Sequence, residues 1–400
     1  MKIQKEKLLI ILTVFIDVVG MGIIIPVMPF YVKSFGASDF TVTLLFSVFS
    51  LCAFLSSPLL GAISDKFGRR PVLMASIFST AIGWLVFAAA GNITMLFLGR
   101  IIDGIAAGNF STAQSYLSDI AKDDKERTSN LGLMGAVFGV AFIIGPAVGG
   151  VLSQISHAFP FWIVGILAIF NTIGIYFFLP ESHKHLKKDA TISINPIKPL
   201  LNAVKDKKLT SRYISWFLFG IAVAIHQSIF ALYLYAVFKI DSTGTGTIFT
   251  IMGAVMILNQ GFLLKNFWLK RFKESSLEVW LFLVGAIGFT VIGIGISWIF
   301  VIGLAVMALS QSVLRVVVSS RVSGIAGVEK RGETLGIMAS VLSLSMIVGP
   351  LLGGALFSYN TGLPFFVAGV AMFLAFLIMN FSKKFSENKF DKELPVAEAL

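Results

Sequence analysis

The chain has 400 residues, of which 56% are hydrophobic and only 13% are charged, and its mean hydropathy is +0.88. A soluble domain carries about twice that charged fraction, so the composition excludes a soluble fold and indicates a membrane protein. The net charge of +11 comes from basic residues in short segments between apolar runs. This pattern is typical of membrane topology and argues against a nucleic-acid partner.

Few residues are suited to metal or cofactor chemistry. The single cysteine, Cys52, excludes an internal disulfide and a cysteine-based metal cage. Only four histidines are present, which argues against a protein metal centre. The chain lacks the G-x-x-x-x-G-K-[ST] pattern that binds nucleotide phosphates, so coupling to ATP within this chain is not expected. No cofactor is predicted.

The first apolar run covers residues 8–32 and follows three lysines. It resembles a secretory signal peptide, but no small-residue cleavage site follows, and Asp17 would be unusual in such a core. We therefore expect a retained first membrane helix with its N-terminus in the cytoplasm.

Eleven further spans are expected, because an apolar segment of about 20 residues crosses a bilayer as a helix. Two uncharged stretches are long enough for helical hairpins, with breaks near Ser156 and near Ser358. The sequence predicts an all-α polytopic membrane protein with twelve transmembrane helices, the first at 8–32 and the others at 41–64, 71–91, 94–117, 131–153, 159–180, 213–237, 246–265, 278–296, 299–321, 334–357 and 362–382.

The distribution of lysine and arginine sets the expected orientation. Only Lys33 and Lys239 lie in predicted outer loops, and only Arg100 and Arg315 lie well inside spans. All other basic residues fall in segments on the side of the N-terminus. By the positive-inside rule, both termini are cytoplasmic, in a cell's inner (cytoplasmic) membrane.

The longest polar segment divides the chain into two halves. The predicted organisation is a six-helix bundle at 1–180, a basic cytoplasmic linker at 181–211, a second six-helix bundle at 212–382 and a cytoplasmic tail at 383–400, expected to be disordered. The linker is interpreted as a solvated connection, with contact to anionic lipid as the alternative.

An internal repeat supports this division. The pattern R-x-x-x-L-G-x-M followed by G-P-x-x-G-G occurs at 127–150 and again at 331–354, and every matched pair has the same offset. The fifth and eleventh spans are therefore equivalent. Parallel halves of this kind are related by an axis along the membrane normal, and a monomer is expected because one chain holds both.

A short charged turn separates the second and third spans at residues 61–71, with the pattern G-x-x-x-D-x-x-G-R-R-P. Asp65 lies four residues before Arg69 and is placed for a local ion pair. One interpretation is a solvated basic loop that only sets the topology. The spacing resembles the loop between helices two and three of the major facilitator superfamily transporters.

Three further motifs are similar to those of the drug:H+ antiporters of this superfamily, in particular the tetracycline/H+ antiporters and related multidrug exporters. They are D-x-x-G-x-G-x-x-x-P-x-x-P at 17–29, G-R-x-x-D-G at 99–104 and the Gly-Pro run at 145–150. The predicted ninth span departs from the resemblance, which implies an acidic residue inside the membrane there.

The resemblance implies a conformational role for several residues. Asp65 and Arg69 with Asp119 resemble a charge cluster that holds helices two, four and eleven together on the cytoplasmic side. The glycine and proline positions allow close helix approach or bending, and packing and hinge roles both remain open. The predicted gating residues are Gly61, Asp65, Gly68, Arg69, Asp119, Gly145, Pro146, Gly349 and Pro350.

Charges inside a bilayer are costly and are therefore candidate functional groups. Arg100 and Asp103 are three residues apart and share one helix face, so they form either a neutral packing pair or, as the resemblance implies, a proton-coupling pair. Asp17 has no cationic neighbour on its own helix and is either a proton or cation site or a hydrogen-bonded structural acid. These three residues are the predicted proton-coupling site.

Polar residues within spans are candidates for a substrate cavity. Arg315 meets an acid across the cavity, an anionic substrate or water, or its side chain extends to the inner interface. His226 is either a packed bundle histidine or a proton carrier. The complete set is Gln114, His226, Gln227, Asn259, Gln260, Gln311 and Arg315.

The leading hypothesis for function is a secondary transporter that exports a small amphipathic drug-like molecule in exchange for protons, by alternating access of the two halves. The energy source is then the proton gradient, and the partners are a small-molecule substrate and the lipid bilayer. The alternative is proton-coupled or facilitated transport of a sugar, siderophore or organic anion. An enzyme or receptor on this fold is disfavoured, because no nucleophile–base or metal constellation is evident.

Overall fold

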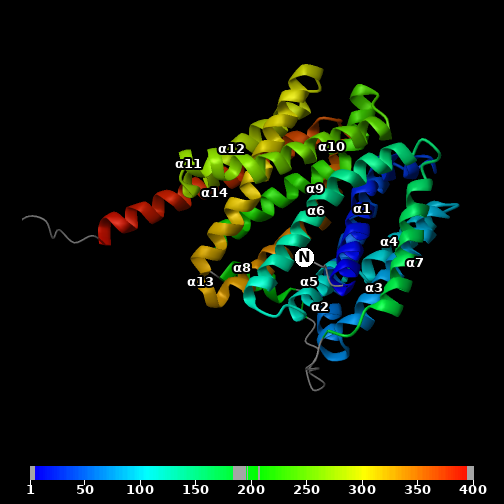
Figure 1. The fold of residues 1–400 in the computed structure, drawn as a ribbon. Helices are drawn as coiled ribbons and strands as arrows, with labels where there is room; N and C mark the ends of the chain where they lie inside the picture. Colours follow the sequence, from blue (N-terminus) through cyan, green and yellow to red (C-terminus); the bar gives the residue numbers. More distant parts are fainter. Residues whose placement is uncertain (1–4, 183–194, 196, 206–207, 394–400) are drawn as a thin grey trace, which may run out of the picture. The chain divides into compact units, whose positions relative to one another are not determined.

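The computed structural model describes residues 5–182, 195, 197–205 and 208–393. All regular secondary structure in these residues is helical (Figure 1). Twelve helical segments in this part of the chain are long and apolar enough to cross a membrane. The prediction of an all-α protein with twelve spans is therefore confirmed.

The first half of the chain follows the predicted spans closely, with one exception. The predicted fourth span, 94–117, is two helices separated by residues 106–108. The break places Asn109 at the start of the second of them. The helices are α1 (Lys5–Lys33), α2 (Asp39–Phe67), α3 (Arg69–Ala88), α4 (Ile93–Ile105), α5 (Asn109–Asp119), α6 (Asp124–Leu152) and α7 (Phe159–Phe178).

The second half contains two irregular helices. The predicted eighth span continues from an α-helix into a π-helix, and the long α13 is broken at Gly327, whose φ of 77° lies in the left-handed region that glycine tolerates. The helices are α8 (Lys198–Lys205), α9 (Thr210–Phe238), α10 (Ser242–Leu258), η1 (Asn259–Trp268), α11 (Leu269–Arg271), α12 (Glu274–Gly293), α13 (Ser297–Phe357) and α14 (Leu363–Glu393).

The predicted linker and tail contain more helix than expected. The linker includes α8, and α14 continues to Glu393, well into the tail that was expected to be disordered. Residues 183–194 of the linker and 394–400 of the tail lie outside the described residues.

The chain packs as two compact units. Unit 1 takes in residues 1–196, 227–254 and 350–359, and unit 2 takes in 197–226, 255–349 and 360–400. Unit 1 therefore includes segments of α9, α10 and α13 from the second half of the sequence. The predicted division into bundles at 1–180 and 212–382 remains a prediction.

Small residues allow helices to approach closely within each unit. In unit 1, α1 crosses α6 at Gly22 and Gly145, where a Cβ added to Gly145 would lie 2.8 Å from the Gly22 Cα. Also in unit 1, the hydroxyl groups of Ser153 and Ser242 lie 2.7 Å apart and join the end of α6 to the start of α10. Helix contacts of this kind depend on backbone approach more than on apolar side chains.

Candidate functional site

Arg100 and Asp103 form a buried ion pair on α4, with 2.9 Å between Nη1 of Arg100 and Oδ2 of Asp103. The predicted placement of the two side chains on one helix face is confirmed. The guanidinium also lies over the Phe49 ring, 4.0 Å from its centroid, and near the Trp84 ring. A cation held by both a carboxylate and aromatic faces is stabilised away from water.

Asp17 is joined to this pair by a chain of hydrogen bonds inside unit 1. The Asn109 side-chain amide donates to Oδ1 of Asp17 at 3.1 Å and to Oγ1 of Thr80 at 3.2 Å. Thr80 in turn hydrogen bonds to the carboxylate of Asp103. The two intramembrane acids of the first half are therefore connected through Thr80 and Asn109.

Close helix packing makes this chain possible. A Cβ added to Gly83 of α3 would lie 2.8 Å from the backbone nitrogen of Asp103, and one added to Gly99 of α4 would lie 2.8 Å from the Gly83 carbonyl oxygen. The two glycines thus bring α3 against α4, so that Thr80, one helical turn before Gly83, reaches Asp103.

The sequence analysis did not identify Thr80 or Asn109 as site residues. Both are polar residues within predicted apolar spans, and this was the signal that the sequence offered. Both are buried in the structure. Their partners lie on other helices, and no motif spacing joins α1, α3, α4 and α5. Only the packing of these helices brings the groups together.

The predicted charge cluster around Arg69 is assembled in unit 1. Arg69 lies 2.7 Å from Oδ1 of Asp65 and 3.1 Å from Oδ2 of Asp119, and its guanidinium also donates to the Ser64 hydroxyl. One arginine at the start of α3 therefore ties the end of α2 to the end of α5. The conformational role of the cluster stays a prediction.

Glu181, which the sequence analysis did not single out, completes the start of α3. Its two carboxylate oxygens accept the backbone N–H groups of Arg69 and Arg70 at 2.8 and 3.1 Å. Gly68, between α2 and α3, has a φ of 106°, and a Cβ there would meet the Glu181 carboxylate. The turn therefore requires glycine both for its backbone conformation and for close approach of Glu181.

We expect Glu181→Ala to destabilise the protein by about 1 kcal/mol, because the first turn of α3 loses the acceptor for two backbone N–H groups. Glu181→Gln, which keeps one carbonyl oxygen, should have a smaller effect. Thermal unfolding of the purified protein in detergent measures the difference. Equal unfolding temperatures for wild type and Glu181→Ala would show that the contact adds nothing to stability.

The predicted cavity residues are divided between the units. Gln114 and Gln227 lie in unit 1, and Gln114 is exposed. Of those in unit 2, Gln311 has a buried Nε2 with no hydrogen-bond partner among the described residues, whereas Gln260 donates to the Ser312 carbonyl oxygen at 3.0 Å. Their role in binding substrate remains a prediction.

Asn259, the first residue of η1, forms hydrogen bonds that hold this helix in place. Its amide donates to the Ser312 hydroxyl at 2.6 Å and accepts from the indole N–H of Trp268 at 2.9 Å. These bonds span the π-helical segment and fix it against α13 within unit 2. π-Helical turns often occur at functional sites, but here the asparagine itself is held by protein groups.

Arg315 and His226 differ strongly in exposure. Arg315 is an exposed residue on α13, and among the described residues no ion pair involves its side chain. His226 is buried and packs edge-on against the rings of Phe289 and Phe365. The packing of His226 favours the bundle-histidine interpretation over that of a proton carrier.

The predicted hinge positions differ in how tightly they are packed. A Cβ added to Gly22 would lie 2.9 Å from the Pro146 ring in unit 1, and a Cβ added to Gly349 would meet Ala224 in unit 2. Pro350 follows within α13, and Gly61 has open space where a Cβ would lie. Close packing at Gly145, Pro146 and Gly349 supports a packing role there, and the hinge role stays a prediction.

Unit 2 contains a second buried charge cluster. Glu278 lies in the second turn of α12 and accepts from Arg212 of α9 at 2.8 Å and from Arg321 of α13. The predicted ninth span, which was expected to lack an internal acid, thus has a buried carboxylate that two arginines hold. Glu278 lies outside the repeated segments 127–150 and 331–354, so the sequence repeat did not indicate this cluster.

No group of three or more potential metal ligands (His, Cys, Asp or Glu) occurs among the residues that the structure describes. Among the charged groups in the described spans, Arg100 and Asp103 are paired with each other and Asp17 is bonded to the neutral Asn109, whereas Arg315 is exposed. Twelve spans that enclose such groups define a multi-pass membrane protein.

The family model of the Major Facilitator Superfamily matches residues 10–275 and 261–399. The chain therefore belongs to this superfamily, and it is a membrane transporter of small molecules and not an enzyme.

Two curated relatives are drug resistance proteins. The class C tetracycline resistance protein of Escherichia coli is 28% identical, over 94% of this chain and 96% of that protein. The quinolone resistance protein NorA of Staphylococcus aureus (strain MRSA252) is 26% identical, over 92% of this chain and 94% of NorA.

Solved structures share the fold at lower identity. A bacterial homologue of the human lysosomal transporter Spinster has a TM-score of 0.77 at 14% identity, covering 94% of this chain and 96% of that one. The human organic anion transporter MFSD10 has a TM-score of 0.69 at 21% identity, covering 94% and 98%. These similarities support the transporter fold and do not distinguish among substrates.

Proposed function

We propose that the protein is a proton-coupled exporter of a small amphipathic, drug-like molecule. The observation that carries the proposal is the chain of side chains from Asp17 through Asn109 and Thr80 to the Asp103–Arg100 pair. A proton gained or lost by either acid changes the hydrogen bonding between α1, α3, α4 and α5. Protonation and helix packing are thereby coupled.

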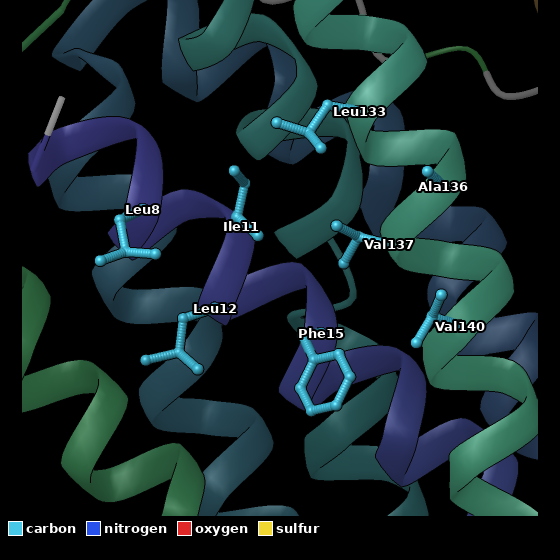
Figure 2. A pocket seen from close by; sticks show the side chains of 8 residues that line it. All are labelled: Leu8, Ile11, Leu12, Phe15, Leu133, Ala136, Val137 and Val140. Atoms are coloured by element: carbon cyan, nitrogen blue, oxygen red, sulfur yellow. The ribbon is translucent and has the colours of Figure 1, made fainter. Parts of the chain in front are cut away.

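A second feature suits the apolar part of such a substrate. An open groove of about 360 Å³ lies between α1 and α6, and Figure 2 shows side chains of both helices facing it. Its lining is entirely apolar: Leu8, Ile11, Leu12, Phe15, Leu133, Ala136, Val137 and Val140. The names of the relatives, tetracycline and quinolone resistance proteins, agree with a substrate of this kind.

The proposed arrangement has both termini in the cytoplasm of a cell whose inner membrane holds the protein as a monomer. The excess of lysine and arginine in the segments on the side of the N-terminus supports this orientation. In this arrangement the Arg69 cluster lies at the cytoplasmic ends of α2, α3 and α5, and its opening accompanies the change of access.

Transport by the purified protein in liposomes tests the proposal. An acidic interior should drive uptake of a fluorescent lipophilic cation, and an ionophore that equilibrates protons should abolish it. Uptake that persists without the gradient would contradict proton coupling. Liposomes without protein measure passive entry of the cation.

The second candidate function is transport of an organic anion, and the exposed Arg315 within a span favours it. A guanidinium at this position is suited to bind a carboxylate or phosphate group of a substrate. Gradient-independent uptake of an anion that is lost in Arg315→Gln, and retained in the exposed control Arg127→Gln, would select this function over cation export.

A further inference from the structure

We propose that unit 1 binds one buried water molecule beside Asp17, and that this water accepts and returns the proton of the Asp17 carboxyl group. Thr13 and Asn171 are the residues that position it. The inference rests on the proposed proton-coupled function and names the group that exchanges the proton.

The site is a small cavity among α1, α3, α5 and α7, lined by both polar and apolar side chains. Its volume is about 10 Å³, which is room for one water molecule. A buried water also needs two to four polar partners. The cavity offers five polar side chains, which are Thr13, Asp17, Thr80, Asn109 and Asn171.

An unused acceptor at the cavity points to a missing donor. Asn109 is 5% exposed, and its Oδ1 is buried with no hydrogen-bond partner among the described residues. Its amide hydrogens are already given to Asp17 and Thr80. An unsatisfied buried acceptor is unfavourable by about 1–3 kcal/mol, and a water that donates to Oδ1 removes this penalty.

Thr13 and Asn171 form another part of the cavity wall, and hydrogen bonds hold both neutral side chains in place. Asn171 of α7 donates to the Thr13 hydroxyl at 3.0 Å, and Thr13 lies 2.9 Å from the Leu9 carbonyl oxygen. Thr13 is four residues before Asp17 and therefore shares its face of α1. The pair thus presents fixed oxygen atoms one helical turn from the carboxylate.

A water is needed because the asparagine cannot carry the proton. The Asn109 amide donates hydrogen bonds to Asp17 and Thr80, but it does not accept and pass on a proton near neutral pH. A water does both. The proton leaves the Asp17 carboxyl for the water, which then gives one of its three hydrogens to the next water on the path to bulk, so no atom is gained or lost.

No other charge crowds the cavity. The residues from α1, α3, α5 and α7 that line it with Asp17 are uncharged, and the α6 residues packed on α1 at Gly22 are Gly145 and Pro146. The charge that acts on Asp17 is that of Asp103, which is itself paired with Arg100. Proton exchange at Asp17 is therefore controlled by the water and by this pair.

The test compares two transport modes of the full-length protein in liposomes. Uptake of the fluorescent cation is driven by a pH gradient in one mode. In the other, labelled cation exchanges for unlabelled cation with no gradient, which requires the substrate site but no net proton movement. Thr13→Val and Asn171→Leu should lower gradient-driven uptake about tenfold and leave exchange unchanged.

Two controls separate the water site from packing. Thr13→Ser keeps the hydroxyl group and should retain gradient-driven uptake. Thr172→Val removes a hydroxyl from the neighbouring position on α7 that bonds only its own helix, at the Ala168 carbonyl, and should also behave as wild type.

Each other outcome overturns the proposal. Normal gradient-driven uptake in both cavity variants would remove the water from the mechanism, although the wild type would still be a proton antiporter. Loss of exchange together with uptake in both would assign Thr13 and Asn171 to packing. Uptake driven by sodium instead of protons would identify the oxygen-lined cavity as a cation site. A wild type that ignores both gradients would overturn the proposed function as well.

Discussion

Asp103→Asn is expected to reduce gradient-driven transport by about 100-fold or more, because it removes a titratable group from the chain that joins Asp17 to Arg100. The asparagine has nearly the same shape, so the contact between α3 and α4 at Gly83 and Gly99 is retained. Uptake of a fluorescent lipophilic cation into liposomes with an acidic interior measures the loss.

The control for this prediction is Asp124→Asn. Asp124 is a fully solvated acid in the first turn of α6, with a side chain 99% exposed, and its substitution should leave transport unchanged. Size-exclusion chromatography shows whether Asp103→Asn is folded. If Asp103→Asn is folded and transports like the wild type, Asp17 is the remaining acid in the hydrogen-bonded series from Asp17 to Arg100 that is able to carry the proton.

Glu278→Ala is expected to destabilise the protein by about 3 kcal/mol, because it leaves two partly buried arginines without their shared carboxylate. The Glu278 side chain is 2% exposed, and those of Arg212 and Arg321 are 13% and 25% exposed. Three helices of unit 2, α9, α12 and α13, lose their common contact. The yield of folded protein and its thermal unfolding in detergent measure the effect.

Glu274→Ala provides the matched control, since Glu274 is an exposed acid one helical turn earlier on α12. Glu274→Ala should leave the stability of the protein nearly unchanged. The triple substitution of Glu278, Arg212 and Arg321 by leucine tests the cause, because apolar residues often replace a buried ion cluster without loss. A triple variant as unstable as Glu278→Ala would show that packing volume, and not charge, is responsible.

The spans themselves could be predicted from the sequence because crossing a bilayer is a local requirement. A helix needs enough consecutive apolar residues, and the structure has all twelve segments, with bounds that differ from the predicted ones by at most seven residues. The departures are local: the break at residues 106–108, the π-helical turn η1, and the helical residues between the predicted tenth and eleventh spans, where Gly327 has a left-handed backbone. Hydropathy reports none of these local features.

The candidate site was predicted only where its partners are neighbours in sequence. Arg100 with Asp103, and Arg69 with Asp65, lie three or four residues apart, so helical geometry alone pairs them. Helix packing decided the rest. It placed Asn109 between Asp17 and Thr80 and Glu278 between two arginines, because these buried polar groups need partners, which lie on helices far along the chain. It also brought the exposed Glu181 to the first turn of α3.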